Sequence, residues 1–127
     1  MPTQKTIDQF IARVVEGAHA EAIEEFYTPQ ASMQENMSAP RQGRDVLAAK
    51  ERATLARVKN VKSTCVQPIF VNGHHVVIRW VFEFEWLDGR NSRIEELAYQ
   101  RWETDANGNE QIAQETFFYD PAQFVAK

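Results

Sequence analysis

The sequence is poor in cysteine and in long apolar segments. Cys65 is the only cysteine, so no disulfide can form within the chain, and such usage is typical of a reducing compartment. No apolar run approaches the ~20 residues that a membrane-spanning helix needs, and residues 1–5 do not lead into the apolar core of a signal peptide. We therefore expect a cytoplasmic protein with no membrane partner.

Positive charge and metal ligands are also scarce. The formal net charge of −4 gives no basic footprint, so no nucleic-acid partner is expected. His74 and His75 are adjacent, so in a strand they point to opposite faces, and His19 is remote from both. Since the chain also lacks a glycine-rich phosphate loop and a serine nucleophile elbow, we expect neither a metal site nor a cofactor.

The clearest pattern that is present is strict alternation over residues 74–86. Aromatic and β-branched side chains fall on one side of this stretch, which is typical of a strand with one face on a core. These side chains are Val76, Ile78, Trp80, Phe82, Phe84 and Trp86. So long a strand must twist and curl, and its aromatic side chains then line the hollow side of the sheet.

The first half of the chain has helical periodicity. Apolar residues recur at three- and four-residue steps over 3–28, which predicts two helices separated at Gly17 and ended by Pro29. Thr3 and Thr6 are alternative starts. A brief strand is expected at 31–36, and the pattern over 44–58 predicts a further helix.

The second half is divided by hairpin-turn dipeptides. Asn72-Gly73, Asp88-Gly89 and Asn107-Gly108 suit tight turns, because these residue types tolerate positive φ. They separate four strand-like runs at about 61–71, 74–87, 91–104 and 110–120. Helices followed by an antiparallel meander predict a single α+β domain over residues 1–127.

This order resembles the nuclear-transport-factor-2-like superfamily, and within it the SnoaL-like polyketide cyclases and the ketosteroid-isomerase-like proteins. The residues that carry the likeness are Glu25-Phe26-Tyr27, Ala31 to Asn36, Gly43-Arg44-Asp45, Gln100-Arg101-Trp102, Asn107-Gly108, Ile112 and Phe118 to Pro121. The resemblance implies a cone-shaped fold (a cystatin-like α+β barrel). In it, about three N-terminal helices pack over a strongly curved antiparallel sheet and a pocket runs into the hollow. Members include isomerases, cyclases, dehydratases, epoxide hydrolases and binding proteins.

The resemblance carries over to catalysis only in part. Glu35 stands where ketosteroid isomerases place a general base, but Ile11 and Ala98 occupy the positions of their oxyanion-hole tyrosine and carboxylic acid. Phe117 matches the catalytic aspartate of polyketide cyclases, and the Arg-Asp pair of limonene epoxide hydrolases has no counterpart. None of these three chemistries is complete.

The strand parity of the family implies which side chains enter the hollow. On the third strand of the meander these are Ile94, Glu96, Ala98, Gln100 and Trp102, and on the fourth Ala113, Glu115, Phe117 and Tyr119. The catalytic candidates are Glu35, Glu115 and Tyr119, and the substrate-binding candidates are Trp80, Phe82, Phe84, Glu96, Gln100, Trp102 and Phe117. Carboxyl groups that converge in an aromatic surround should have raised pKa values, suited to proton abstraction next to a carbonyl.

Each candidate also has a structural interpretation. Glu35 pairs with Arg41 or Arg44 at the pocket rim in that interpretation, and Glu115 pairs across strands with an arginine such as Arg101. The aromatic side chains are then ordinary core.

Three functions therefore stand as hypotheses: a cofactor-free isomerase- or cyclase-type enzyme on a hydrophobic carbonyl compound, a binding protein for a small hydrophobic molecule, and a dimeric interaction module. The outer sheet face mixes Val77, Leu97 and Tyr99 with charged residues, which suits a homodimer contact.

Overall fold

The structure, a computed structural model, describes residues 1–124. Its helices are α1 (Gln4–Val15), α2 (His19–Phe26), α3 (Arg44–Leu55) and the short 3₁₀ turn η1 (Pro121–Phe124). Thr3 is the N-cap of α1, and its hydroxyl accepts a hydrogen bond from the Thr6 backbone N–H at 3.2 Å. Of the two alternative starts, Thr3 is therefore the one used, and α1 and α2 separate around Gly17 as predicted.

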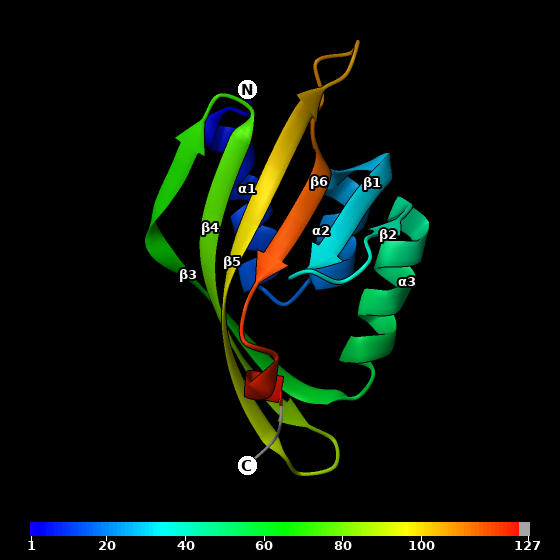
Figure 1. The fold of residues 1–127 in the computed structure, drawn as a ribbon, viewed down its shortest axis with the longest axis vertical. Coiled ribbons are helices and arrows are strands. Elements are labelled where there is room, and N and C mark those ends of the chain that lie inside the picture. The colour runs from blue at the N-terminus through cyan, green and yellow to red at the C-terminus, as the bar shows by residue number, and fades with distance from the viewer. Residues whose placement is uncertain (125–127) are drawn as a thin grey trace.

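The strands are β1 (Tyr27–Glu35), β2 (Arg41–Gln42), β3 (Val58–Asn72), β4 (His75–Trp86), β5 (Asn91–Thr104) and β6 (Glu110–Phe118). They form one six-stranded sheet in the order β2-β1-β6-β5-β4-β3. Figure 1 shows the helices gathered on one side of this sheet, with the long strands β3, β4 and β5 extending beyond them. The predicted α+β architecture is confirmed.

The meander from β3 to β6 is antiparallel throughout, as the turn dipeptides predict. Gly73 and Gly89 have φ values of +60° and +90°, which the tight turns require and which residues with a Cβ rarely adopt.

The sheet differs from the expectation in two respects. It is mixed, because β1 runs parallel to β6, and it is open, with β2 and β3 at its edges in the described residues. Pro29 lies inside β1 rather than ending the helix, which stops at Phe26. The β1–β6 register shifts between Tyr27 and Ser32, so Pro29 falls at an irregularity where its missing N–H is tolerated.

The inward face of β4 is as predicted. Val76, Ile78 and Trp80 are at most 2% exposed, and they form the core with α1, α2 and α3. On β6 the parity changes, because Trp102 pairs with Ile112 while Arg101 pairs with Gln114, leaving Ala113 as an extra residue. Ile112 is consequently fully buried, and the expectation that Ala113 takes this inward place is wrong.

No helix in the described range is long and apolar enough to cross a membrane.

Candidate functional site

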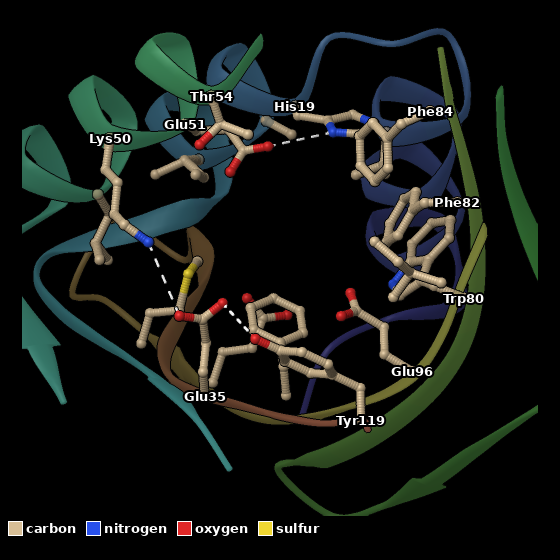
Figure 2. Close-up of a pocket in the computed structure, with 18 of the residues that line it drawn as sticks. His19, Glu35, Lys50, Glu51, Thr54, Trp80, Phe82, Phe84, Glu96 and Tyr119 are labelled. Atoms are coloured by element: carbon tan, nitrogen blue, oxygen red, sulfur yellow. Dashed lines mark hydrogen bonds and ion pairs between the residues drawn. The ribbon is translucent and has the colours of Figure 1, made fainter. Parts of the chain in front are cut away.

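A cavity of about 360 Å³ opens between the helices and the concave face of the sheet. Its wall is aromatic on the sheet side, with carboxyl groups set among the rings (Figure 2). Of the predicted site residues, those that line it are Glu35, Trp80, Phe82, Phe84, Glu96, Glu115, Phe117 and Tyr119. Gln100 and Trp102 lie one layer behind the wall, so the structure does not place them as ligand contacts.

The aromatic wall is built by the alternation along β4. Trp80 stacks on Phe82 with ring centroids 5.5 Å apart, and Phe84 stacks on Trp86 at 5.2 Å. Alternate residues of a strand share one face, so four consecutive inward positions present a continuous ladder of rings to the cavity. Such a surface suits a flat hydrophobic molecule.

Glu35, at the end of β1, is held by three neighbours. Its Oε1 accepts a hydrogen bond from the Tyr119 hydroxyl at 2.9 Å, while its Oε2 lies 3.3 Å from Arg41 Nη1 and 3.8 Å from Lys50 Nζ. Burial acts to raise the pKa of Glu35, but the contacts with Tyr119, Lys50 and Arg41 outweigh it and hold the pKa below its usual value. The expectation of a raised pKa is therefore wrong for Glu35, and its pairing with Arg41 is confirmed.

Arg44, the other partner considered for Glu35, instead donates a hydrogen bond to the backbone carbonyl of Tyr27 at 3.3 Å.

Glu115, on β6, is 1% exposed and lies opposite Gln100 of β5. Its carboxylate accepts hydrogen bonds from the Tyr27 hydroxyl and from Gln100 Nε2, the latter at 2.7 Å. Burial raises the pKa of Glu115 to about 7, although both hydrogen bonds oppose the shift. The alternative pairing with Arg101 is wrong, because Arg101 binds Glu103 at 2.7 Å.

Among the carboxyl groups that line the cavity, Glu96, on β5, is the one that no other described side chain engages. Within residues 1–124 it has no hydrogen-bond or ion-pair partner, and Figure 2 shows its carboxyl pointing into the cavity. Burial, together with the smaller effect of the charges of Glu115, Glu51 and Glu35, raises the pKa of Glu96 to about 8. At neutral pH Glu96 is therefore mainly a neutral carboxylic acid that can donate a hydrogen bond.

The opposite wall carries a group that sequence reasoning missed. His19, on α2, is 3.4 Å from a Glu51 oxygen through Nδ1 and 2.8 Å from the Ser63 hydroxyl through Nε2 (Figure 2 shows the pair with Glu51). Helix periodicity is the signal that could have found both, because His19 precedes the buried Ala22 and Ile23 by three and four residues, and Glu51 follows Leu47 and Ala48 by four and three.

The His19 group resembles a Ser-His-Glu triad, but Ser63 does not line the cavity and is 6% exposed. A substrate in the cavity does not reach its hydroxyl. Ser63 therefore holds the imidazole in place, and His19 and Glu51 are the two members of the group that line the cavity.

Residues 1–124 contain neither a cluster of metal ligands nor a thiol with a lowered pKa. In the part of the chain that the structure describes, no group of three or more His, Cys, Asp or Glu side chains is placed to hold a metal ion. Burial raises the pKa of the Cys65 thiol, which makes it less reactive as a nucleophile.

Comparison with known proteins places this geometry in a family. The fold is shared with a candidate SnoaL-like polyketide cyclase from Mesorhizobium loti (TM-score 0.72, 20% identity, covering 94% of this chain and 100% of the other). It is shared with a hypothetical protein of ketosteroid isomerase-like fold from Catenulispora acidiphila, solved in complex with trimethylamine (TM-score 0.74, 18% identity, 96% and 90%). An NTF2-like protein of unknown function from Burkholderia pseudomallei is similar as well (TM-score 0.76, 12% identity, 95% and 92%).

No curated protein matches the sequence. The family model of the SnoaL-like domain matches residues 7–119, which include every strand from β1 to β6 and nearly all of the cavity wall. The fold is that of NTF2-like proteins, and the chain belongs to the SnoaL-like domain family.

Proposed function

We propose that this protein binds a small hydrophobic carbonyl compound in the cavity and moves a proton on it, as an isomerase or cyclase does, without a cofactor. The observation that carries the proposal is a pair of carboxyl groups in one cavity whose pKa values are displaced in opposite directions. The pKa of Glu35 lies below its usual value and that of Glu96 is raised to about 8. Two carboxyl groups separated in this way can act as base and acid at the same pH.

Glu35 is the general base in this proposal. It is ionised at neutral pH, and its contact with the Tyr119 hydroxyl fixes the orientation of the carboxylate toward the cavity. The same contacts lower its basicity, so we expect it to act on a carbon acid that a strong hydrogen-bond donor activates at the same time.

Glu96 is that donor. A negative charge that develops on the substrate's carbonyl oxygen is stabilised by a neutral carboxylic acid held in an apolar site. The position at which ketosteroid isomerases carry such an acid is Ala98, which is fully buried and cannot donate, but Glu96 is the preceding inward residue of the same strand. Glu115 assists indirectly, because its carboxylate accepts hydrogen bonds from Tyr27 and Gln100 and thereby holds both side chains in place.

Solvent deuterium exchange tests this function. The protein is incubated in D₂O with a panel of aryl and alicyclic ketones, and loss of the proton next to the carbonyl is followed by NMR. For a ketone that the protein accepts, Glu35→Gln and Glu96→Gln should each slow exchange by ~10²–10⁴-fold. Glu83→Gln, at an exposed outer-face position, is the matched control and should exchange at the wild-type rate.

Full exchange activity in Glu35→Gln would exclude Glu35 as the base. Ketones that bind tightly without any exchange would instead favour a binding protein. The third hypothesis, an interaction module with a filled hollow, is disfavoured by the cavity of about 360 Å³, because ligand sites begin near 300 Å³.

We also propose that the protein is a cytoplasmic homodimer formed through the outer face of the sheet. Leu97, Tyr99 and Phe118 are each about 45% exposed on neighbouring strands of this face. The ion pairs Arg79–Glu95 and Arg101–Glu103 balance its charge, which suits contact with a second copy of the same surface.

A further inference from the structure

The cavity has a buried interior and a charged mouth. Trp80, Ile94 and Glu115 in the interior are at most 2% exposed. Three cations line the cavity from exposed positions: Arg41 on β2, Lys50 on α3 and Arg57 just after α3. The mouth therefore combines positive charge from separate segments, although the protein as a whole has a net charge of −4.

The acidic groups that line the cavity do not neutralise all of this positive charge. Glu35 is contacted by both Arg41 and Lys50, and Glu51 is held by His19. Arg57 has no carboxylate within 4 Å in the described residues, and Asp88, on the adjoining turn, pairs with Arg90 at 2.8 Å. The charge of Arg57 contributes to lowering the pKa of Asp88, but within residues 1–124 no side chain accepts a hydrogen bond from the Arg57 guanidinium.

Arg57 is nevertheless held in place. Its guanidinium carbon lies 5.7 Å from the centre of the Trp86 ring, and its backbone carbonyl accepts a hydrogen bond from Leu87 at 2.9 Å. The indole is itself fixed, because Trp86 Nε1 donates to the Ser92 hydroxyl at 2.9 Å and the ring stacks on Phe84. A guanidinium held over an aromatic ring by a cation–π contact can still present its planar fork of N–H donors to a ligand, and this fork matches the geometry of a carboxylate.

We propose that the ligand is an amphipathic carboxylate, with its hydrophobic body against the aromatic wall and its carboxylate bound by Arg57 at the mouth. The inference rests on the proposed function and narrows it, since the substrate would be a hydrophobic acid that also carries a carbonyl group. Lys50 and Arg41, which also line the cavity, add positive charge to its wall.

A cavity lined by aromatic and acidic side chains also suits a cationic ligand, which is the alternative to a carboxylate. The contacts argue against it, because Glu35 and Glu51 already have cationic or imidazole partners and Glu115 has two hydrogen-bond donors. Glu96, the remaining carboxyl, is mainly neutral at pH 7 and lacks the negative charge that an ammonium group needs. Among the cationic groups that line the cavity, Arg57 is the one that has no ion-pair partner within residues 1–124.

Three probes of equal shape test the proposal by calorimetry at pH 7: 2-naphthylacetate, 2-naphthylacetamide and 2-(2-naphthyl)ethylamine. We expect the acid to bind about 10-fold tighter than the amide and the amine to bind most weakly, since a hydrogen bond to a charged group contributes roughly that factor. In Arg57→Gln the acid should fall to the affinity of the amide, while the affinity of the amide itself is unchanged. Arg93→Gln, an exposed arginine of the outer face, should bind all three as the wild type does.

The outcomes separate this proposal from the function on which it rests. Equal binding of acid and amide, tightest binding of the amine, or an acid preference that persists in Arg57→Gln would each overturn the anionic ligand while leaving a hydrophobic carbonyl substrate in place. Failure of all three probes to bind would overturn the anionic ligand and the ligand-binding cavity together.

Discussion

Glu96 and Glu115 are largely buried carboxyl groups on the neighbouring strands β5 and β6, and each is stabilised in a different way. Glu115 is stabilised by two hydrogen-bond donors, Tyr27 and Gln100. Glu96 has no such donor and retains its proton instead, with a pKa raised to about 8. The first arrangement builds a rigid interior and the second leaves a reactive group in the cavity.

The raised pKa of Glu96 makes stability depend on pH. The group titrates near 4.5 in the unfolded chain and near 8 in the folded protein, so between these values the folded state binds more protons. Its contribution therefore lowers the free energy of unfolding as pH rises from 5 to 8, by up to about 1.4 kcal/mol per pH unit. Urea unfolding at pH 5, 6, 7 and 8 should show a shallower decline in Glu96→Gln than in the wild type.

Glu83→Gln serves as the control for this series, because Glu83 is exposed and should keep the wild-type slope. The difference in slope between the wild type and Glu96→Gln isolates Glu96, since Glu115, with a pKa of about 7, is present in both proteins. A decline in Glu96→Gln as steep as in the wild type would show that Glu96 is ionised throughout.

Tyr27→Phe tests the buried network. The substitution removes one of the two donors to Glu115, so we expect the free energy of unfolding at pH 8 to fall by about 1–3 kcal/mol. It should also raise the pKa of Glu115 above 7, as followed by carboxyl-carbon NMR.

Tyr119→Phe is the matched substitution at the mouth of the cavity. Its hydroxyl contacts the partly exposed Glu35, so we expect a loss of less than about 1 kcal/mol and a rise in the pKa of Glu35. Equal losses for the two tyrosines would contradict the distinction between a buried and a solvated network.

Sequence reasoning placed these carboxyl groups in the hollow and expected raised pKa values for them, a direction that is right for Glu96 and Glu115 but wrong for Glu35. Inward position follows from alternation along a strand, which is a local property. The pKa of Glu35 depends on Lys50, fifteen residues away, and on Tyr119, near the other end of the chain. Partners so distant in sequence are brought together only by the fold.

At the scale of elements, the sequence predicts best where the signal is local. The turn dipeptides located β3 to β6 within a few residues, because a turn that needs positive φ marks where each strand ends, whether the loop is short, as at Gly73, or longer, as at Gly108. β1 was expected only as a brief strand, since Met33 is the large apolar residue within 31–36 and the strand's alternation is weak. The bulge at Ala113 cannot be recognised from the sequence, because an alanine side chain is compatible with either face of the sheet.

The junction of η1 with β5 offers an element-scale prediction. β6 pairs with β5 only as far as Leu97, and beyond that point the Gln123 side chain continues the ladder. It accepts from the Glu95 backbone N–H at 2.8 Å and donates to the Glu95 carbonyl at 3.1 Å. Gln123→Ala should therefore increase hydrogen exchange at the Glu95 amide by about 3- to 10-fold, as the loss of a hydrogen bond of roughly 0.5–1.5 kcal/mol implies.

Gln114→Ala is the control for η1, since Gln114 is exposed on β6 and should leave exchange at Glu95 unchanged. Exchange at Ile78, in the centre of the sheet, should be unchanged in both variants. An unaltered Glu95 amide in Gln123→Ala would mean that η1 contributes nothing to the end of the sheet.

At the scale of the whole molecule, the sheet has one covered face and one open face. The helices and the cavity occupy the concave side, while the outer side presents apolar residues in register across four strands. Phe70 pairs with Val77, Val77 with Tyr99, and Leu97 with Phe118. These pairings make the apolar surface contiguous. In a single copy it is in contact with water, since Phe70 is 64% exposed.

Self-association through this surface is the last prediction. Sedimentation equilibrium of the wild type should give twice the chain mass of 14.6 kDa. Leu97→Glu should weaken the dimer by at least ~100-fold, because a two-fold contact brings the two introduced carboxylates together and like charges at an interface cost several kcal/mol. Val46→Glu, at a position 56% exposed on α3, should remain dimeric. A wild-type monomer, or a Leu97→Glu dimer as tight as the wild type, would show that the outer face is solvated, with its ion pairs serving only the sheet itself.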